Sequence, residues 1–467
     1  MPRRIETDYL VVGAGAMGMA FTDALIDHAD VHVTLVDRRH TAGGHWHDAY
    51  GFVQLHQASL FYGVASTVLG TGTIQSTGPE KGLQERAPRD EIAAYYDDVL
   101  RRRFEASGRV TFLGGHEHHA DGVDHVLTSL DSGERVVVDV RRRVVDATYL
   151  APTVPATTPP PFTVGPGATV VPVGDLPRLG AGTRRFVIVG SGKTATDGIV
   201  WLLGQGVDAD AITWVRPREP WMLNRAVVQP DPAVAFGLAA DTMAAAADAS
   251  SLDEVFLRLE AAGVMLRVDT GAVPTMAKTP TLGVWELELL RTVDDVVRLG
   301  HIREATGSEL VFDDGVVALG DDTVVVHCAA EGLKYPPLVP VWGPDAIRPQ
   351  TIRAGFPCFN AALAGYVEAT RDDDRERNRL CPPNTLPNDP VTWAQMQVRG
   401  SLATRAFMAE PDIAEWANAC ALNPSAMRPD QAELPAVKAA LARLSEVAAP
   451  GLQRLTDMSD LQYIKSN

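Results

Sequence analysis

Residues 8–18 read DYLVVGAGAMG, and this stretch decides the fold because a short apolar run leads directly into a glycine-rich turn. A second stretch of the same kind, RFVIVGSGKTA, occupies residues 185–195. In a dinucleotide-binding βαβ unit, the first glycine makes the tight turn and the second lets backbone N–H groups approach a pyrophosphate. The third position, Gly or Ala, lets the helix pack on the strand. One such pattern is weak evidence, but two in the correct context predict two dinucleotide-binding domains.

The residue that ends the next strand-like run distinguishes the two copies. After the first turn, the run at residues 31–36 ends at Asp37, whose carboxylate can accept hydrogen bonds from a ribose diol. After the second, the run at residues 211–215 ends at Arg216, with Arg218 close behind. A guanidinium there suits the 2′-phosphate of NADP, although both arginines can also be read as solvated loop charges. The pattern at the first turn is that of an FAD or NAD site, and the pattern at the second turn favours NADP over NAD.

The sequence of the second turn excludes a P-loop nucleoside triphosphatase. Gly192-Lys193-Thr194 looks like the end of a phosphate-binding P-loop. That motif needs a glycine five positions before Gly192, where this chain has Val187.

Composition narrows the classes of partner. The formal net charge of −17 argues against nucleic acid and anionic membranes, which would repel the chain. The four cysteines lie far apart without a Cys-x-x-Cys pair, so neither a disulfide framework nor a redox dithiol is predicted. No run approaches the roughly 18 apolar residues that span a bilayer. A cytoplasmic enzyme is the default expectation, and the oligomeric state stays open.

A proline-rich stretch marks the crossing between domains. Six prolines fall within residues 152–166, directly after the strand-like run at 144–150, and such density is incompatible with a helix or a central strand. We expect an α/β fold with two Rossmann-like dinucleotide-binding domains. The FAD-binding domain is discontinuous, over residues 1–164 and 322–467, and ends in C-terminal helices. The NADP-binding domain covers residues 165–321 and carries an alanine-rich helical insertion at 233–262.

This layout resembles the two-dinucleotide-binding-domain flavoproteins, and within them the flavin-containing monooxygenase-like group, over most of residues 5–340. The segment Gly43-Gly44-His45-Trp46 is similar to the Gly-Gly-x-Trp segment that passes over the flavin in that group. Residues 146–148 and 328–332 stand where the group has its two domain-crossing strands. The histidine-containing fingerprint of class B monooxygenases is absent, because no histidine lies between His125 and His301. The resemblance thus implies FAD and NADPH binding without Baeyer–Villiger chemistry.

The predicted cofactor-binding residues come from the two turns, the strand ends, the flavin segment and the first crossing strand. They are Gly13, Gly15, Ala16, Met17, Gly18, Asp37, Arg38, Gly44, His45, Trp46, Thr148, Gly190, Ser191, Gly192, Lys193, Thr194, Arg216 and Arg218. Four polar residues are nominated beside the isoalloxazine ring, although each can equally be a hydrogen-bonded structural residue: His56, Gln54, Gln57 and Tyr62.

Two further groups of residues have alternative interpretations. The histidines at 45–47 and 116–119 lack the helical i, i+4 spacing of metal ligands, so we predict no metal site. The run at 110–113 before the second histidine group is expected to be the strand beside the adenine of FAD. Trp214, Trp221, Asn224 and Arg225 either line the nicotinamide channel or cap a strand end.

The predicted chemistry begins with hydride transfer from NADPH to FAD. As a monooxygenase, the enzyme would then use O₂ to form a C4a-(hydro)peroxyflavin and oxygenate a small organic molecule. As an NADPH oxidase or dehydrogenase, it would pass electrons on without inserting oxygen. A non-catalytic redox sensor that responds to NADPH is a third possibility, but a sensor needs one nucleotide site, whereas two sites of different type favour electron transfer between them.

Overall fold

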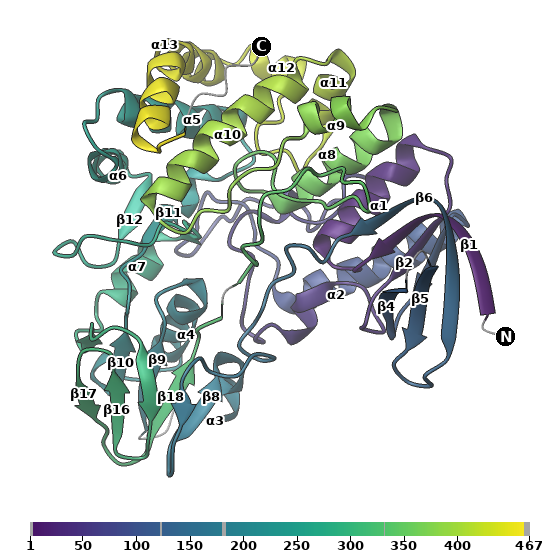
Figure 1. Cartoon of the computed structure of the whole chain (residues 1–467). Helices are drawn as coiled ribbons and strands as arrows, with labels where there is room; N and C mark the ends of the chain where they lie inside the picture. The colour runs from purple at the N-terminus through teal and green to yellow at the C-terminus, as the bar shows by residue number, and fades with distance from the viewer. Residues whose placement is uncertain (1–2, 122–123, 180–183, 331, 462–467) are drawn as a thin grey trace.

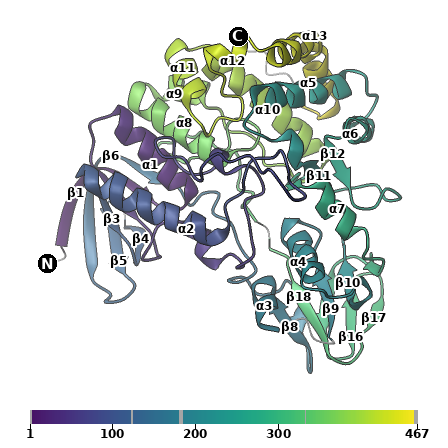
Figure 2. The ribbon, with the colours of Figure 1, turned by 180° about the vertical axis from the view of Figure 1, so that it is seen from behind.

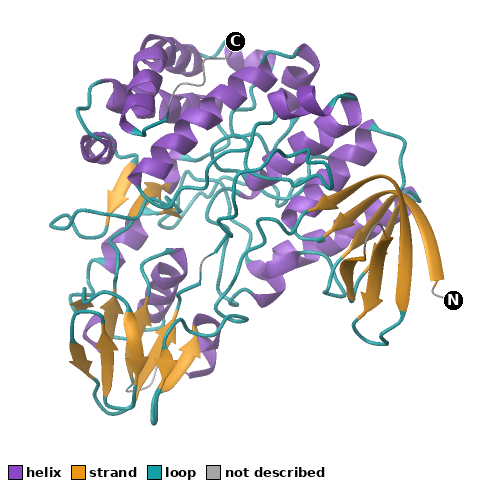
Figure 3. Cartoon of the chain, in the orientation of Figure 1, coloured by secondary structure: helices purple, strands orange, loops and turns teal. Residues whose placement is uncertain are grey.

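The computed structural model describes residues 3–121, 124–179, 184–330 and 332–461. Two groups of strands lie at opposite sides of the molecule, one around β1 (Arg3–Val12) and the other around β9 (Arg185–Val189). A layer of helices spans the upper part of the view in Figure 1, and Figure 3 shows further helices beside both groups of strands. Within the described ranges, no helix is both long and apolar enough to cross a membrane.

The first sheet has the strand order β3-β2-β1-β6-β5-β4. Its neighbouring strands β3, β2, β1 and β6 are parallel to one another. Strand β5 is antiparallel to β6, and β4 is antiparallel to β5. Figure 2 shows the helix α2 (Arg89–Asp98) in front of these strands. The expected strand at 110–113 is confirmed as the edge strand β3. The remaining strands of this sheet are β2 (Val33–Val36), β3 (Val110–Leu113), β4 (His116–Asp121), β5 (Asp124–Ser129) and β6 (Arg135–Asp146).

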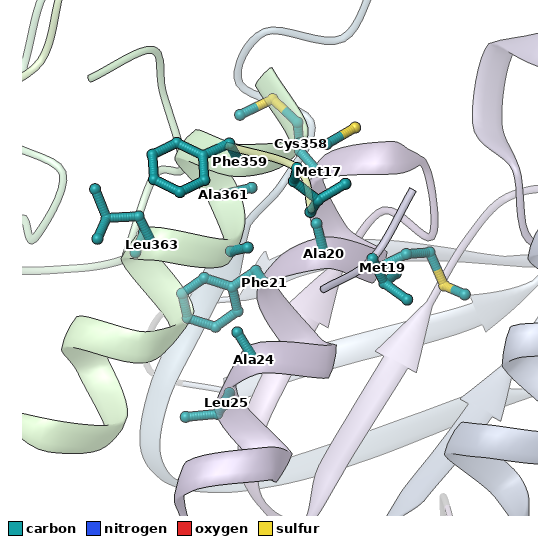
Figure 4. Packing of buried hydrophobic residues seen from close by; sticks show 14 of the residues in the cluster. Met17, Met19, Ala20, Phe21, Ala24, Leu25, Cys358, Phe359, Ala361 and Leu363 are labelled. Atoms are coloured by element: carbon teal, nitrogen blue, oxygen red, sulfur yellow. The ribbon is translucent and has the colours of Figure 1, made fainter. Parts of the chain in front are cut away.

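Helix α1 (Ala16–His28) packs between the first sheet and α8 (Pro357–Thr370), which comes from far along the chain. Ten of the thirteen residues of α1 are buried. Figure 4 shows Ala20 and Phe21 of α1 on the side of that helix that faces Ala361 and Leu363 of α8. The helices approach so closely that a Cβ on Gly365 would collide with the carbonyl oxygen of Phe21. Helix α8 therefore belongs to the core of the first domain.

The second sheet is entirely parallel, in the order β14-β10-β9-β18-β8, and α4 (Lys193–Gly204) follows β9. One face of this sheet packs on a smaller sheet of order β17-β16-β15-β7 through Val187, Val325 and Phe312. Two Rossmann-like units are thus confirmed. The other strands of the two sheets are β7 (Thr163–Val164), β8 (Thr169–Pro172), β10 (Ile212–Val215), β14 (Val296–Val297), β15 (Ile302–Ala305), β16 (Glu309–Phe312), β17 (Val316–Ala318) and β18 (Thr323–His327).

The helical insertion expected at 233–262 forms α5 (Pro232–Ala247) and α6 (Leu252–Ala261). These helices do not pack alone. Helix α13 (Pro435–Met458) lies against α5, where a Cβ on Gly451 would collide with the backbone of Met243, and α10 (Pro390–Met408) contacts α6 and α13. The C-terminal residues 322–467 therefore divide: β18 joins the second sheet, α8 joins the first domain, and α10 and α13 join the insertion to form the helical layer.

Short elements complete the fold. A three-stranded sheet of order β12-β11-β13 lies under the helical layer, and Trp221 of β11 stacks on Phe256 of α6 at 5.1 Å between ring centroids. The remaining strands and helices are β11 (Trp221–Asn224), β12 (Met265–Arg267), β13 (Thr281–Leu282), α3 (Leu176–Leu179), α7 (Val284–Leu290), α9 (Asp374–Leu380), α11 (Pro411–Ala419) and α12 (Pro429–Ala432).

Candidate functional site

The first glycine turn connects β1 to α1 and leaves the helix N-terminus open. Gly13 adopts φ +105°, a conformation that disfavours side chains. Gly15 caps α1 without any side-chain acceptor for the first N–H groups. Gly44 lies against it, because a Cβ on Gly44 would be 2.9 Å from Cα of Gly15. Uncapped N–H groups at a helix N-terminus are suited to a phosphate, so Gly15, Ala16 and Met17 can hold a pyrophosphate here.

Asp37 lies at the end of β2, beside this turn. Its carboxylate accepts hydrogen bonds from the N–H of Ala14 at 2.7 Å and the N–H of Arg39 at 2.8 Å. Arg38 points to the surface, 3.6 Å from Glu117. The Asp37 carboxylate is therefore fixed at the carboxyl end of β2, where a ribose is expected. It retains acceptor capacity because each oxygen can accept more than one hydrogen bond.

Both domain-crossing segments lie beside the glycine turn of their own sheet. A Cβ on Gly13 would be 3.0 Å from Cγ2 of Thr148, which follows β6. In the second sheet, a Cβ on Gly190 would be 3.7 Å from Cβ of Cys328, which follows β18. Glu331 of the second segment lies outside the described residues.

The segment that is similar to the flavin-covering Gly-Gly-x-Trp segment forms a short 3-10 turn over Gly44–Asp48. The Gly43 N–H donates to the carbonyl of Ala14 at 2.9 Å, which ties the segment to the first turn. Trp46 Nε1 donates to the hydroxyl of Tyr62 at 2.7 Å, and the two rings meet edge to face. Burial raises the pKa of Tyr62 far above its usual value, so the hydroxyl stays neutral. Tyr62 therefore positions Trp46. Burial, aided by the charge of Arg39, lowers the pKa of His45 to about 4.

The second glycine turn repeats the geometry of the first. Gly190 adopts φ +125°, and its carbonyl accepts a hydrogen bond from Trp214 Nε1 at 2.7 Å. Gly192 caps α4 without a side-chain acceptor, and a Cβ there would meet no atom within 4 Å. The approach to the N–H groups of Lys193 and Thr194 is thus open, while Ser191 is buried.

Lys193 directs its ammonium group into the protein. The Nζ atom bonds to Asp197 and lies 3.2 Å from Oε1 of Glu286, and the side chain is 6% exposed. Because two carboxylates already neutralise this ammonium, the structure supports a phosphate contact from the Lys193 backbone rather than from its side chain.

Lys193 belongs to a chain of alternating charges that joins the two domains, which we call the junction network. Its members are Arg86, Glu80, Arg225, Glu286, Lys193 and Asp197. Arg225 is completely buried and bonds to Glu80 of the first domain and, at 2.6 Å, to Oε2 of Glu286. Tyr50 of the first domain donates to Asp197 at 2.6 Å. Burial alone would raise the pKa of Glu286, but Lys193 and Arg225 outweigh it and hold the pKa at about 2.

The arginines after β10 are held by protein partners. Arg216 is 3% exposed; its guanidinium lies 4.6 Å over the Trp214 ring, and Nη1 is 3.3 Å from Glu219. Its Nε has no hydrogen-bond partner among the described residues. Arg218 donates to the carbonyl of Thr275 at 2.7 Å. A 2′-phosphate bound by Arg216 would therefore have to displace Glu219, and it would satisfy a buried group that lacks a full set of partners.

A cavity of about 560 Å³ lies between the helical layer and the sheet of β11 and β13. His56 and Gln57 reach it from the first domain. Burial, together with the charge of Lys193, lowers the pKa of His56 to about 4, so its imidazole is neutral at neutral pH. Gln54 is exposed and does not line the cavity, and Tyr62 is engaged with Trp46. The structure thus brings only His56 and Gln57 of the four nominated residues to one cavity.

Several functional residues escaped sequence analysis. Glu80, Arg86, Asp197 and Glu286 lie in no recognised motif, and sequence analysis names only Lys193 and Arg225 of the junction network. Among the other polar groups, His118 and His125 face each other across β4 and β5 with ring nitrogens 3.1 Å apart. In the part of the chain that the structure describes, no group of three or more His, Cys, Asp or Glu side chains can hold a metal ion.

Comparison with known proteins establishes the family. Residues 11–63 match the family model of the NAD(P)-binding Rossmann-like domain. The protein Rv2000 of Mycobacterium tuberculosis (strain ATCC 25618 / H37Rv) is 40% identical over 428 residues, which cover 90% of this chain and 78% of Rv2000. The chain belongs to the Rv2000 family. Another protein of this family, Mb2023 of Mycobacterium bovis, matches at the same identity and coverage.

Solved structures with similar folds include two monooxygenases. An oxidized steroid monooxygenase bound to NADP is 14% identical with a TM-score of 0.49, over 96% of this chain and 99% of that chain. A flavin-containing monooxygenase from Stenotrophomonas maltophilia is 16% identical with a TM-score of 0.40, over 71% of this chain and 79% of that chain. Sequence identities and TM-scores this low do not assign the activity of those enzymes to this member of the Rv2000 family.

Proposed function

We propose that this protein is an FAD-dependent, NADPH-consuming oxidoreductase, and specifically a monooxygenase that acts on a small organic molecule. The observation that carries the proposal is the pair of uncapped glycine turns, which follow parallel strands of two separate sheets, in domains that both line one cavity. The first domain is tied to the second beside that cavity, because Arg225 Nε donates to the carbonyl of His56 at 2.9 Å. Residues of both domains line this cavity, and two dinucleotide-binding domains beside one cavity suit electron transfer between two cofactors.

The residues present fit the two cofactors. At the first turn, the N–H groups after Gly15 would hold the pyrophosphate of FAD and Asp37 its ribose, while Gly44 and Trp46 lie on the side expected for the flavin ring. At the second turn, Gly192 leaves the N–H groups of α4 open for NADPH, with Arg216 as the candidate for the 2′-phosphate. When bound, FAD would supply hydride acceptance and reaction with O₂.

The chain itself would provide the environment for that chemistry. Most side chains that line the cavity are apolar, including Phe61, Phe356 and Trp393, so the cavity excludes water from a bound substrate. His56 is uncharged at neutral pH and can both donate and accept a hydrogen bond there.

The first test is spectroscopic. We expect the purified protein, or protein reconstituted with FAD, to show a flavin absorbance that NADPH bleaches without oxygen faster than NADH does. The glycine variant Gly192→Val should slow reduction by NADPH while FAD stays bound, because the added methyl groups block the second turn. A protein that retains no FAD after reconstitution would contradict the proposal.

The second test separates oxygen insertion from simple oxidation. After the reduced protein is mixed with oxygenated buffer, a monooxygenase should yield a product that carries label from ¹⁸O₂. Hydrogen peroxide should account for only part of the NADPH consumed. Peroxide equal to NADPH with every substrate would instead identify an oxidase.

A further inference from the structure

The cavity lined by His56 and Gln57 differs from the rest of the chain in the sign of its charged side chains. Of the 467 residues of the chain, 59 are Asp or Glu, yet no described residue that lines the cavity is acidic. Three cationic residues line it, and they come from three separate segments: Lys278, Arg353 and Arg405. The fully charged side chains among the described residues that line this cavity are therefore all cationic, although the chain as a whole is strongly acidic.

Arg353 is the most informative of the three. Its Nη1 donates to the amide oxygen of Asn423 at 2.6 Å and to the hydroxyl of Ser425 at 3.1 Å, both of which are neutral. Its Nε is buried without a hydrogen-bond partner in the described ranges. No Coulombic interaction with a carboxylate contributes to the pKa of Arg353, which burial alone lowers to about 10, so the group is still a cation at neutral pH.

The surroundings of this guanidinium are otherwise apolar. The Cζ atom of Arg353 lies 5.6 Å from the ring centroid of Phe356 and 5.8 Å from that of Phe359. A partly buried cation beside aromatic rings with only neutral hydrogen-bond partners is unfavourable unless an anion compensates it. Compensation by a ligand is consistent with the position of Arg353 on the cavity wall.

We propose that the cavity binds an apolar organic molecule that carries one carboxylate, and that Arg353 pairs with this carboxylate. A guanidinium presents parallel N–H donors that match the two oxygens of a carboxylate. The apolar remainder of the cavity would take the hydrocarbon body of the ligand. This inference rests on the proposed function in taking the ligand to be the substrate, but its binding test does not require turnover.

The test compares acids with their uncharged amides. The probes are phenylacetate, cinnamate and decanoate, each beside its primary amide, titrated into the FAD-loaded protein by calorimetry and by thermal unfolding. At least one acid should bind about tenfold or more tightly than its amide, because only the acid completes an ion pair. Equal affinity of acid and amide in all three pairs, or no binding of any acid, would overturn the proposal.

Variants locate the anion site. Arg353→Gln should remove the preference for the acid and leave the affinity for the amide unchanged, whereas Arg353→Lys should keep part of it. Arg348→Gln is the matched control, because Arg348 pairs with Asp345 outside the cavity. Persistence of the full preference in Arg353→Gln would refute the role of Arg353. If that variant does not fold, the acid-over-amide comparison in the unaltered protein decides the proposal.

The outcome is separable from that of the proposed function. Flavin content and reduction by NADPH are measured on the same preparations without any acid. A protein that prefers acids but is not reduced by NADPH would refute the oxidoreductase assignment alone. A protein that is reduced by NADPH but shows no preference would refute the carboxylate site alone.

Discussion

The junction network makes a quantitative prediction about Glu286. Replacement by Gln keeps the shape of the side chain but removes a charge that contacts Arg225 at 2.6 Å and Lys193 at 3.2 Å. The pKa of Glu286 falls from 4.5 to about 2 in the folded protein, which corresponds to about 3 kcal/mol at 1.36 kcal/mol per pKa unit. Removing one partner of a buried ion pair typically costs about 3–5 kcal/mol. We therefore expect Glu286→Gln to lower the free energy of unfolding by about 3 kcal/mol at pH 7.

The pH dependence provides an independent check. A carboxyl group with a lowered pKa contributes its full stabilisation above the pKa of the unfolded chain and loses it as the pH falls through the folded value. The difference between the unaltered protein and Glu286→Gln should thus be constant down to about pH 5 and decline toward pH 2. At pH 3.5 it should be smaller by about 1.4 kcal/mol.

The assay is urea unfolding followed by tryptophan fluorescence at several pH values. Trp285 is a suitable reporter because its Nε1 donates to Glu80 of the network at 3.2 Å. Glu433→Gln is the matched control, since Glu433 forms an exposed pair with Lys438 and surface pairs contribute about 0–1 kcal/mol. The reasoning would be refuted by equal effects of the two substitutions, or by a Glu286 effect that does not change between pH 6 and pH 3.5.

Four further predictions concern the two nucleotide sites and the helix packing. Gly15→Val should abolish FAD retention in a folded protein, as measured by flavin absorbance per chain, since the methyl groups occupy the phosphate approach. Arg216→Ala should reduce the NADPH-to-NADH ratio of kcat/KM about tenfold to a hundredfold, and an unchanged ratio would exclude Arg216 as the phosphate ligand. Gly365→Ala should destabilise the protein by about 1–3 kcal/mol in thermal or urea unfolding, because its Cβ collides with Phe21. In contrast, Gly237→Ala in α5 meets no atom within 4 Å and should stabilise by about 0.5–1 kcal/mol.

The parts of the fold that could be predicted are those set by local sequence. Each glycine turn specifies its own strand, turn and helix, so β1 with α1 and β9 with α4 follow from two short stretches. The segments at Thr148 and Cys328, for which the resemblance implies domain-crossing strands, lie beside these turns. Strand runs and turns act over a few residues, which is why they can be read from sequence.

The parts that could not be predicted depend on contacts between distant segments. Glu80 and Arg225 are 145 residues apart in sequence, and nothing near either residue indicates the other. Sequence analysis predicts Lys193 as a cofactor-binding residue, and nothing near it indicates that its ammonium is bound by Asp197 and Glu286. The division of the C-terminal helices between α1 and α5 likewise depends on which apolar faces fit each other, and sequence periodicity does not reveal that choice.

The pairing of α5 with α13 has a consequence for synthesis of the chain. Helix α5 ends at Ala247 and its partner begins at Pro435, so the ribosome must add the intervening residues before the two can meet. At about 5–20 residues per second, this interval lasts roughly ten to forty seconds. During that time α5 can pack on α6, which follows it directly, but it lacks α13, although both glycine turns have already been made. A nascent chain can thus form its nucleotide turns well before it can close the cavity, and a chaperone that recognises apolar helices would find α5 available throughout that interval.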